Sequence, residues 1–281
     1  MLTLAEAWGE RPNGSNPAPH IERFGERKRE RLLSADELAR LGTALSDAER
    51  RRTEGDRILA ETAQARSAIS AALLQNDSLG AKMVRDQLRS LRKDHKKLGE
   101  LSSLESIAAI RLLLFTGARL SEILGLEWDW VDFERGEARL PDSKTGAKTV
   151  QLPAPALEVL ASLPRLDGNP YVISGRRTGA HLVNLGKPWR RIRKAAGLDD
   201  LRIHDLRHAF AGIAASSGMG LPIIGKMLGH AQPQTTARYA HVAPDPVKQA
   251  AATVAGTIAA AMRGEADEVV VVSGRSKRQS V

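Results

Sequence analysis

The stretch 46–99 restricts the fold more than any other part of this chain, because it contains no proline and only three glycines. It is rich in Ala, Arg, Glu and Gln, which favour helices. Val84, Leu88, Leu91 and Leu98 recur at steps of three and four residues or their sum, the period of an amphipathic helix. We therefore expect one or two helices here, with Asn76-Asp77-Ser78 as the turn between them.

The rest of the chain predicts further helices around one small sheet. Ser34 followed by Glu37 is a capping box and predicts a helix that ends at about Leu45. The apolar run 104–115 predicts a second helix, ended by Thr116-Gly117. Strand-like segments at 128–133, 137–140 and 149–152 are separated by Arg-Gly and Thr-Gly turns. The predicted fold is mainly α with a small three-stranded antiparallel β-sheet.

Three regions follow from the spacing of proline and glycine. Residues 1–33 contain several of both and predict a linker. Residues 34–263 predict one domain, within which the helical stretch 46–99 is an insertion. Residues 264–281 predict a flexible tail.

Composition excludes several classes of protein. The chain has 281 residues and a net charge of +9, which permits a polyanionic partner. The absence of cysteine excludes a disulfide scaffold, a cysteine-ligated metal and a thiol nucleophile. Aromatic residues make up 4%, which argues against a single-strand binder that stacks bases. No apolar run of transmembrane length and no signal pattern occur, so we expect a cytoplasmic protein.

A basic run lies in the second half of the insertion. Between Lys82 and Lys97 there are seven basic residues and two acidic ones, a net of five positive charges. Such a run is commonly a solvated helix face; the functional alternative is a helix that contacts DNA phosphates. The candidate contacts are Lys82, Arg85, Arg89, Arg92, Lys93 and Lys96.

Two cations stand at turns. Arg119 directly follows Gly117-Ala118 near the start of a predicted helix, where the helix dipole disfavours a cation. A guanidinium there suits an anion site, with Glu122 three residues on to hold it; the alternative is a plain surface ion pair. Lys144 lies at a predicted hairpin tip, where a lysine is either solubilising or a mobile acid that reaches a leaving oxygen.

The segment 204–211 concentrates proton-bearing groups on one helical face. His204, Arg207 and His208 are spaced i, i+3 and i+4, which favours an anion opposite them. The two histidines are alternatively metal ligands, with His230 or His241 as a third. Arg207 would repel a cation, and the HExxH pattern is absent. Packing against the following helix is the simplest role for His208.

Tyr239 follows these groups and is one of only two tyrosines. A phenol becomes a competent nucleophile when cations stabilise its oxyanion. The other, Tyr171, lies in an apolar strand-like run, which favours core packing.

The ordered set Arg119, Lys144, His204-x-x-Arg207, His230 and Tyr239 resembles the tyrosine recombinases (phage integrase family), over about residues 34–263. The resemblance implies their catalytic-domain fold, shared with type IB topoisomerases. It also implies that Arg119 and Arg207 hold the scissile phosphate while Tyr239 forms a 3′-phosphotyrosyl link. Lys144 would protonate the leaving oxygen, His204 would act as base and His230 would donate a hydrogen bond to the phosphate. Neither a metal ion nor another cofactor is implied.

The resemblance also implies partners and exposes two departures. The partners would be double-stranded DNA and further copies of the chain, in a tetramer. The family's N-terminal core-binding domain is represented only by a short remnant within 1–33. The insertion 46–99 is longer than the connection usual at that point, and the resemblance implies no role for it. The alternative to a recombinase is therefore a truncated, non-catalytic DNA-binding or interaction protein that retains the fold.

Overall fold

The computed structural model describes residues 6–16, 31–142, 146–243, 251, 254–259 and 262. The chain divides into two units, Met1–Glu30 and Arg31–Val281. Residues 264–281, expected to form a flexible tail, lie outside the described residues. Among the described residues no helix is long and apolar enough to cross a membrane.

The first long helix, α2 (Ala35–Leu74), begins as its sequence predicts. Ser34 Oγ accepts from the Glu37 N–H, and Glu37 Oε2 accepts from the Ser34 N–H. The expected end at Leu45 is wrong, because the helix runs on without a break for 40 residues. No proline interrupts the helix. Its second half packs against a partner helix, and this packing offsets the loss of helix stability caused by Gly42 and Gly55.

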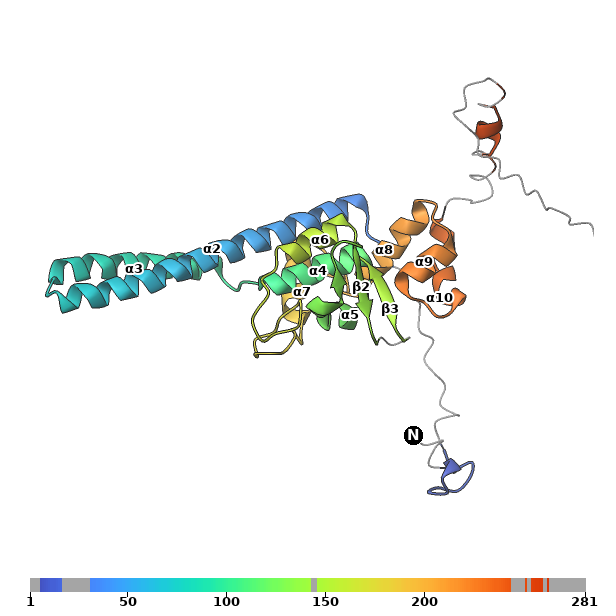
Figure 1. The fold of residues 1–281 in the computed structure, drawn as a ribbon, viewed down its shortest axis with the longest axis horizontal. Coiled ribbons are helices and arrows are strands. Elements are labelled where there is room, and N and C mark those ends of the chain that lie inside the picture. Colours follow the sequence, from blue (N-terminus) through green and yellow to red (C-terminus); the bar gives the residue numbers. More distant parts are fainter. Residues whose placement is uncertain are drawn as a thin grey trace, which may run out of the picture. The chain divides into compact units, whose positions relative to one another are not determined.

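The partner is α3 (Ser78–Leu98), joined to α2 at the expected turn. Asn76 adopts a positive φ of 56°, and the Asp77 side chain caps α3 by accepting from the Gly80 N–H. Figure 1 shows the two helices running side by side away from the rest of the domain. We call residues 55–98 the arm and the remainder of 31–243 the body.

Heptad spacing holds the arm together. One set of less exposed residues on each of α2 and α3 recurs in steps of three and four, as in an antiparallel coiled coil. They are Gly55, Ile58, Thr62, Ala65, Ile69 and Ala72 on α2, and Ala81, Val84, Leu88, Leu91, His95 and Leu98 on α3. Gly55 allows close approach: a Cβ there would lie 2.4 Å from Leu101 Cδ1.

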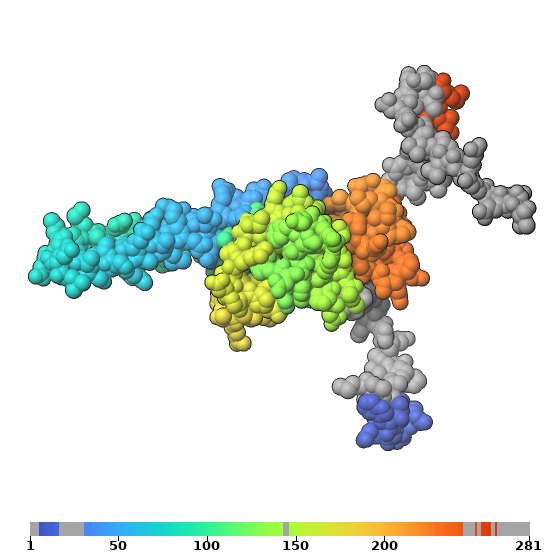
Figure 2. Space-filling model, viewed as in Figure 1, coloured from blue at the N-terminus to red at the C-terminus, as the bar shows by residue number. Residues whose placement is uncertain are grey.

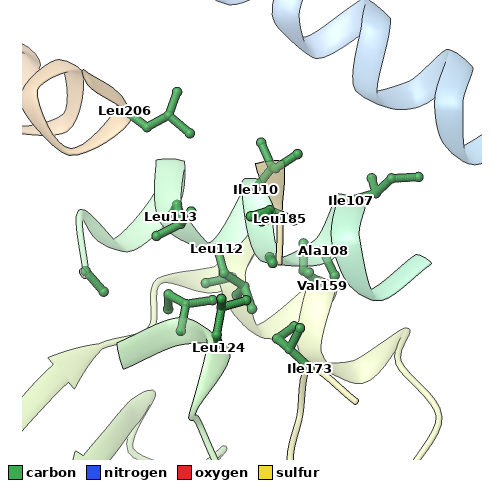
Figure 3. Close-up of a cluster of buried hydrophobic side chains, with 14 of the residues drawn as sticks. Ile107, Ala108, Ile110, Leu112, Leu113, Leu124, Val159, Ile173, Leu185 and Leu206 are labelled. Atoms are coloured by element: carbon green, nitrogen blue, oxygen red, sulfur yellow. The ribbon is translucent and has the colours of Figure 1, made fainter. Parts of the chain in front are cut away.

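The body is built around α4 (Leu104–Thr116), which is capped by Ser103 and ended by Gly117 in the left-handed conformation. Eight of its residues are buried, six of them apolar, as expected for a central helix. Figure 3 shows α4 between Leu206 of α8 and Leu124 of α5. The first part of α2 packs on the same core through Leu41 and Leu45.

A small sheet follows α5 (Leu120–Leu124) and the 3₁₀ turn Trp128–Trp130. Its strands are β1 (Val131–Asp132), β2 (Glu137–Leu140) and β3 (Lys148–Gln151), in the order β1-β2-β3 and all antiparallel. The predicted three-stranded meander is thus confirmed, but the expected first strand at 128–133 is wrong in its first part, because residues 128–130 form the 3₁₀ turn. Ala138 pairs with Val150 and Leu140 with Lys148, so Lys148 lies on the face of β3 that is turned to the core.

Five more helices complete the described body: α6 (Ala154–Ala161), α7 (Gly186–Ala195), α8 (Asp205–Ser216), α9 (Leu221–Leu228) and α10 (Pro233–Ala237), with a 3₁₀ turn at Ala240–Val242. A second apolar cluster joins α8 and α9 to Tyr239. It consists of Ala211, Ala214, Ala215, Ile224, Leu228 and Tyr239. These contacts place Tyr239 beside α8.

Candidate functional site

Two arginines are anchored on the ends of helices. Arg207, on α8, donates from Nη1 to Gly117 O at 2.6 Å and from Nη2 to Leu228 O at 2.8 Å. Arg119, at the start of α5, donates from Nη2 to Gly229 O at 3.2 Å. These carbonyls end α4 and α9, and the C-terminus of a helix favours a cation. The position of Arg119 is therefore explained by the end of α9, against which its side chain lies.

One carboxylate ties the cations together. Glu122 accepts from Arg119 Nη1 at 2.7 Å and from Lys148 Nζ at 2.8 Å. It also accepts from the Arg119 N–H at 2.9 Å, so it caps α5 as well. The Glu122 and Lys148 side chains are 5% and 7% exposed. Sequence reasoning placed Glu122 beside Arg119 but did not anticipate Lys148.

Glycine is required at both helix ends that receive the arginines. Gly117 and Gly229 have φ of 62° and 68°, which L side chains rarely adopt. A Cβ on Gly117 would lie 2.5 Å from Phe210 Cδ1, and one on Gly229 would lie 2.8 Å from Lys148 Cε. Close approach and positive φ together explain the Thr-Gly and Leu-Gly-His motifs.

The cluster carries more positive than negative charge. Burial lowers the pKa of Lys148, and its contact with Glu122 opposes this. Burial would raise the pKa of Glu122, but hydrogen bonds from Lys148 and from Arg119 hold it below its ordinary value. Three cations thus share one carboxylate. Since Arg207 is only 5% exposed, an added anion would relieve repulsion inside the site.

The histidines around the cluster are held neutral. Burial, and then the charges of Arg207, Arg119 and Lys148, lower the pKa of His230 to about 4. Its Nδ1 lies 2.8 Å from Thr236 Oγ1. With the Thr236 hydroxyl donating to Nδ1, the proton of the neutral ring is on Nε2, where it is a hydrogen-bond donor. Partial desolvation, followed by the charge of Arg207, also lowers the pKa of His204.

Tyr239 is paired with His208. The hydroxyl lies 2.6 Å from His208 Nδ1, and the phenol is 5% exposed. His204 stacks edge-on against His208, with 5.0 Å between ring centroids. Sequence reasoning gave His208 a packing role and missed this contact, whose only advance signal was the shared face of His204 and His208. Tyr171 packs edge-on against His181.

One part of the body, which contains α5, α8, α9 and α10, supplies most of the site residues predicted from the sequence. They are Arg119, Glu122, Arg207, His204, His208, His230 and Tyr239. Lys144 lies outside the described residues. The six basic residues at 82–96 lie on the arm. In the described part of the chain no group of three or more His, Cys, Asp or Glu side chains is arranged to hold a metal ion.

Replacing Glu122 with glutamine should strongly destabilise the fold. Lys148 and Arg119 would lose their shared carboxylate, and removing one partner of a buried ion pair costs about 3–5 kcal/mol. Urea unfolding of Glu122→Gln measures the loss. The control is Glu137→Gln, whose partner Arg139 is 56% exposed; this loss should stay below about 1 kcal/mol. Equal losses in the two variants would contradict the role given to Glu122.

The low pKa of His230 predicts a pH-dependent stability. Between about 4 and its ordinary value of 6.5 the unfolded chain binds a proton that the folded chain does not. The free energy of unfolding should therefore fall as the pH drops through this window. His230→Gln should lessen the fall, and His204 and His208 should account for part of the remainder. Urea unfolding at several pH values measures this change, with the substitution of an exposed histidine, His241→Gln, as the control. If the free energy of unfolding of His230→Gln falls with pH as much as that of the wild type, the assignment is refuted.

Comparison with known proteins gives the site a family context. A family model described as the phage integrase family matches residues 82–245. Tyrosine recombinase XerA of Pyrococcus furiosus is 31% identical over 164 residues, covering 55% of this chain and 57% of XerA. The integrase of Salmonella phage P22 is 31% identical over 157 residues, covering 49% of this chain and 39% of that protein. The chain thus spans about half the length of the curated relatives it matches.

Among solved structures, the XerH site-specific recombinase bound to its difH substrate is 26% identical. That match covers 54% of this chain and 48% of XerH, with a TM-score of 0.44.

Proposed function

Because this chain belongs to the phage integrase family, we propose that it is a site-specific DNA recombinase, with Tyr239 as the nucleophile. The observation that carries the proposal is the cluster of Arg119, Lys148 and Arg207 with a single carboxylate, beside neutral His230. Such a cluster is suited to a phosphodiester, whose negative charge it would neutralise. The hydroxyl of Tyr239 lies 2.6 Å from His208 Nδ1, and the phenol is close enough to Arg207 for the two groups to interact electrostatically.

The reaction exchanges one phosphodiester bond for another. Tyr239 Oη attacks phosphorus, the bond from phosphorus to the 5′-oxygen breaks, and a 3′-phosphotyrosyl link forms. The phenol proton leaves to a histidine, and the 5′-oxygen receives a proton from an acid. Attack by a 5′-hydroxyl reverses these steps and rejoins the strand. The bond energy stays in the covalent link, so the exchange requires neither ATP nor a metal ion.

The remaining groups take roles that their chemistry supports. Arg119 and Arg207 hold the two non-bridging oxygens, for which a guanidinium fork is suited. His230 donates from Nε2 as charge develops on the phosphate. His204 accepts the proton of the attacking hydroxyl, and Lys144 is proposed to protonate the 5′-oxygen. Lys148 keeps Glu122, and through it Arg119, in position.

We assign His208 as a positioning residue for the phenol. Its hydrogen bond holds the Tyr239 hydroxyl, while its ring packs edge-on against that of His204. A misplacement of the hydroxyl by about 1 Å costs about 10²-fold in rate. His208→Leu should therefore slow covalent capture by up to about 10²-fold. His208→Asn, which keeps a hydrogen-bonding group near the place of Nδ1, should restore most of the rate. Equal rates in Leu and Asn variants would contradict the assignment.

Covalent capture tests the proposed function. The protein is mixed with a nicked duplex whose cleaved strand loses a short fragment, so that rejoining cannot occur. A protein–DNA adduct that persists on a denaturing gel is expected, and it should survive a chelator. Because the target site is unknown, a pool of duplexes with randomised sequence is the substrate. Failure to form any adduct, with DNA binding intact, would favour a non-catalytic DNA-binding protein.

Assembly follows from the number of nucleophiles. Exchange between two duplexes cleaves four strands, and each chain offers one Tyr239. We therefore propose a tetramer on double-stranded DNA, acting in the cytoplasm. Cross-linking of the DNA complex should give four protein chains.

A further inference from the structure

We propose that the outer face of α3 on the arm is a second contact surface for duplex DNA, separate from the candidate catalytic cluster. Lys82, Arg85, Arg89, Arg92, Lys93 and Lys96, here called the basic stripe, are all exposed. At about 100° per residue they fall within an arc of about 100° of the helix circumference. The only other α3 residue on this arc is Ser78. The proposal relies on the proposed function only in taking duplex DNA as the substrate.

The heptad packing of the arm turns this arc outward. The seam residues of α3, from Ala81 to Leu98, contact α2 and lie on a different side of the helix. Figure 2 shows that the arm projects beyond the body, so the body does not cover its length. A coiled coil is stiff over this length. The basic stripe is therefore presented on a rigid, solvent-exposed support.

Ion pairing differs sharply between the two helices. On α2, Arg50 pairs with Asp47, Arg52 with Asp56, and Arg57 with both Glu54 and Glu61. On α3, Arg89 pairs with Asp86 at 3.0 Å, and Lys97, outside the stripe, pairs with Asp94 at 2.7 Å. Within the arm, all of which the structure describes, the other five stripe cations have no carboxylate within ion-pair distance.

Asp86 borders the stripe and pairs with Arg89, whereas two other acidic groups lie well away from it. Glu54 of α2 and Asp94 of α3 lie close enough that the charge of Asp94 opposes the lowering of the Glu54 pKa by Arg57. Glu61 follows Glu54 by two helical turns and shares its flank. Glu54 pairs with Arg57 and Asp94 pairs with Lys97, so neither carboxylate neutralises the stripe. This segregation gives the arm one positive side.

The dimensions and composition of the stripe fit a duplex. From Lys82 to Lys96 the helix rises about 21 Å, over which B-DNA presents about 12 phosphate charges. The arc contains no large apolar side chain that could insert into a lipid surface. A straight row of cations one helical turn apart matches a regular polyanion, and phosphate contacts of this kind add affinity without sequence specificity.

Salt-dependent binding distinguishes a DNA contact made by the basic stripe from a general effect of the protein's net charge. The stripe variant is Arg85→Gln, Arg92→Gln and Lys93→Gln; the control is Arg50→Gln, Arg52→Gln and Arg57→Gln, which also removes three positive charges. Both are made in Tyr239→Phe, so that no adduct forms, and affinity for a mixed-sequence duplex longer than the arm is measured by fluorescence anisotropy across a salt series. Circular dichroism checks that both remain helical.

The stripe variant should bind about 10–100-fold more weakly at low salt. The plot of log affinity against log salt concentration should be less steep by about 2–3, because each lost phosphate contact reduces the magnitude of the slope by about 0.9. The control should stay near the parent on both measures. Equal losses in the two variants, or no loss in either, would overturn the proposal. Covalent capture by the wild-type chain is scored separately, so that a failure of the chemistry and a failure of the arm contact are distinguishable.

Discussion

Tyr239→Phe should abolish covalent capture of DNA while leaving the fold intact. The substitution removes the oxygen proposed to attack phosphorus and keeps the ring that fills the cluster with Ile224 and Leu228. The lost hydrogen bond to His208 should cost only about 0.5–1.5 kcal/mol. Adduct formation with the nicked substrate, and thermal unfolding of the free protein, measure the two effects.

Tyr171→Phe is the matched control for this substitution. It removes the hydroxyl of the chain's other tyrosine, whose ring packs against His181, and capture should continue at the wild-type rate. Persistence of the adduct in Tyr239→Phe would show that another group is the nucleophile. Loss of the adduct in both variants would point to a general defect and not to a role for Tyr239.

Arg207→Lys should slow strand cleavage by about 10²–10³-fold, the range for losing a preorganised charge donor. Lysine keeps the positive charge but lacks the fork that binds Gly117 O and Leu228 O and that would hold a phosphate oxygen. We choose lysine because alanine would remove the Arg207 donor to Gly117 O, whereas Leu228 O also accepts from Lys148 Nζ at 3.1 Å. Single-turnover capture at saturating protein reports the cleavage step without the contribution of DNA binding.

The control for Arg207 is Arg193→Lys on α7. Arg193 also donates from Nη1 to a backbone carbonyl, that of Leu201 at 2.7 Å. Both variants should lose stability, but only Arg207→Lys should lose rate at temperatures where both are folded. A wild-type cleavage rate in Arg207→Lys would remove Arg207 from the phosphate site.

Local signals in the sequence predicted much of the fold. The Ser34 cap, the turn at Asn76–Ser78 and the glycine end at Gly117 each depend on neighbours within a few residues, and all three are confirmed. The continuation of α2 past Leu45 depends on a distant partner. It is stabilised by α3, which packs along the second half of α2 and which no signal near Leu45 announces.

The site divides in the same way. The motifs around Arg119, Arg207 and His230 are visible as ordered short patterns, since each lies at a helix end with its own glycine or cap. Lys148 was missed because a lysine in a hairpin is usually exposed. The available signal was its alternation with Val150 and Leu152, which places all three on the core side of β3. The contact between His208 and Tyr239 joins residues 31 positions apart and depends on how α8 packs.

The unbroken course of α2 restricts how the length of this protein can change. Its first turns are fixed in the body by Leu41 and Leu45, while its later turns pack in heptads on α3. Adding one residue to α2 alone would rotate everything beyond it by about 100° and turn the seam away from its partner. Matched additions of seven residues to both helices restore the pairing and move the tip outward by about 10 Å. The length of the arm can thus change only in steps of whole heptads, while the direction in which the arm leaves the body stays the same.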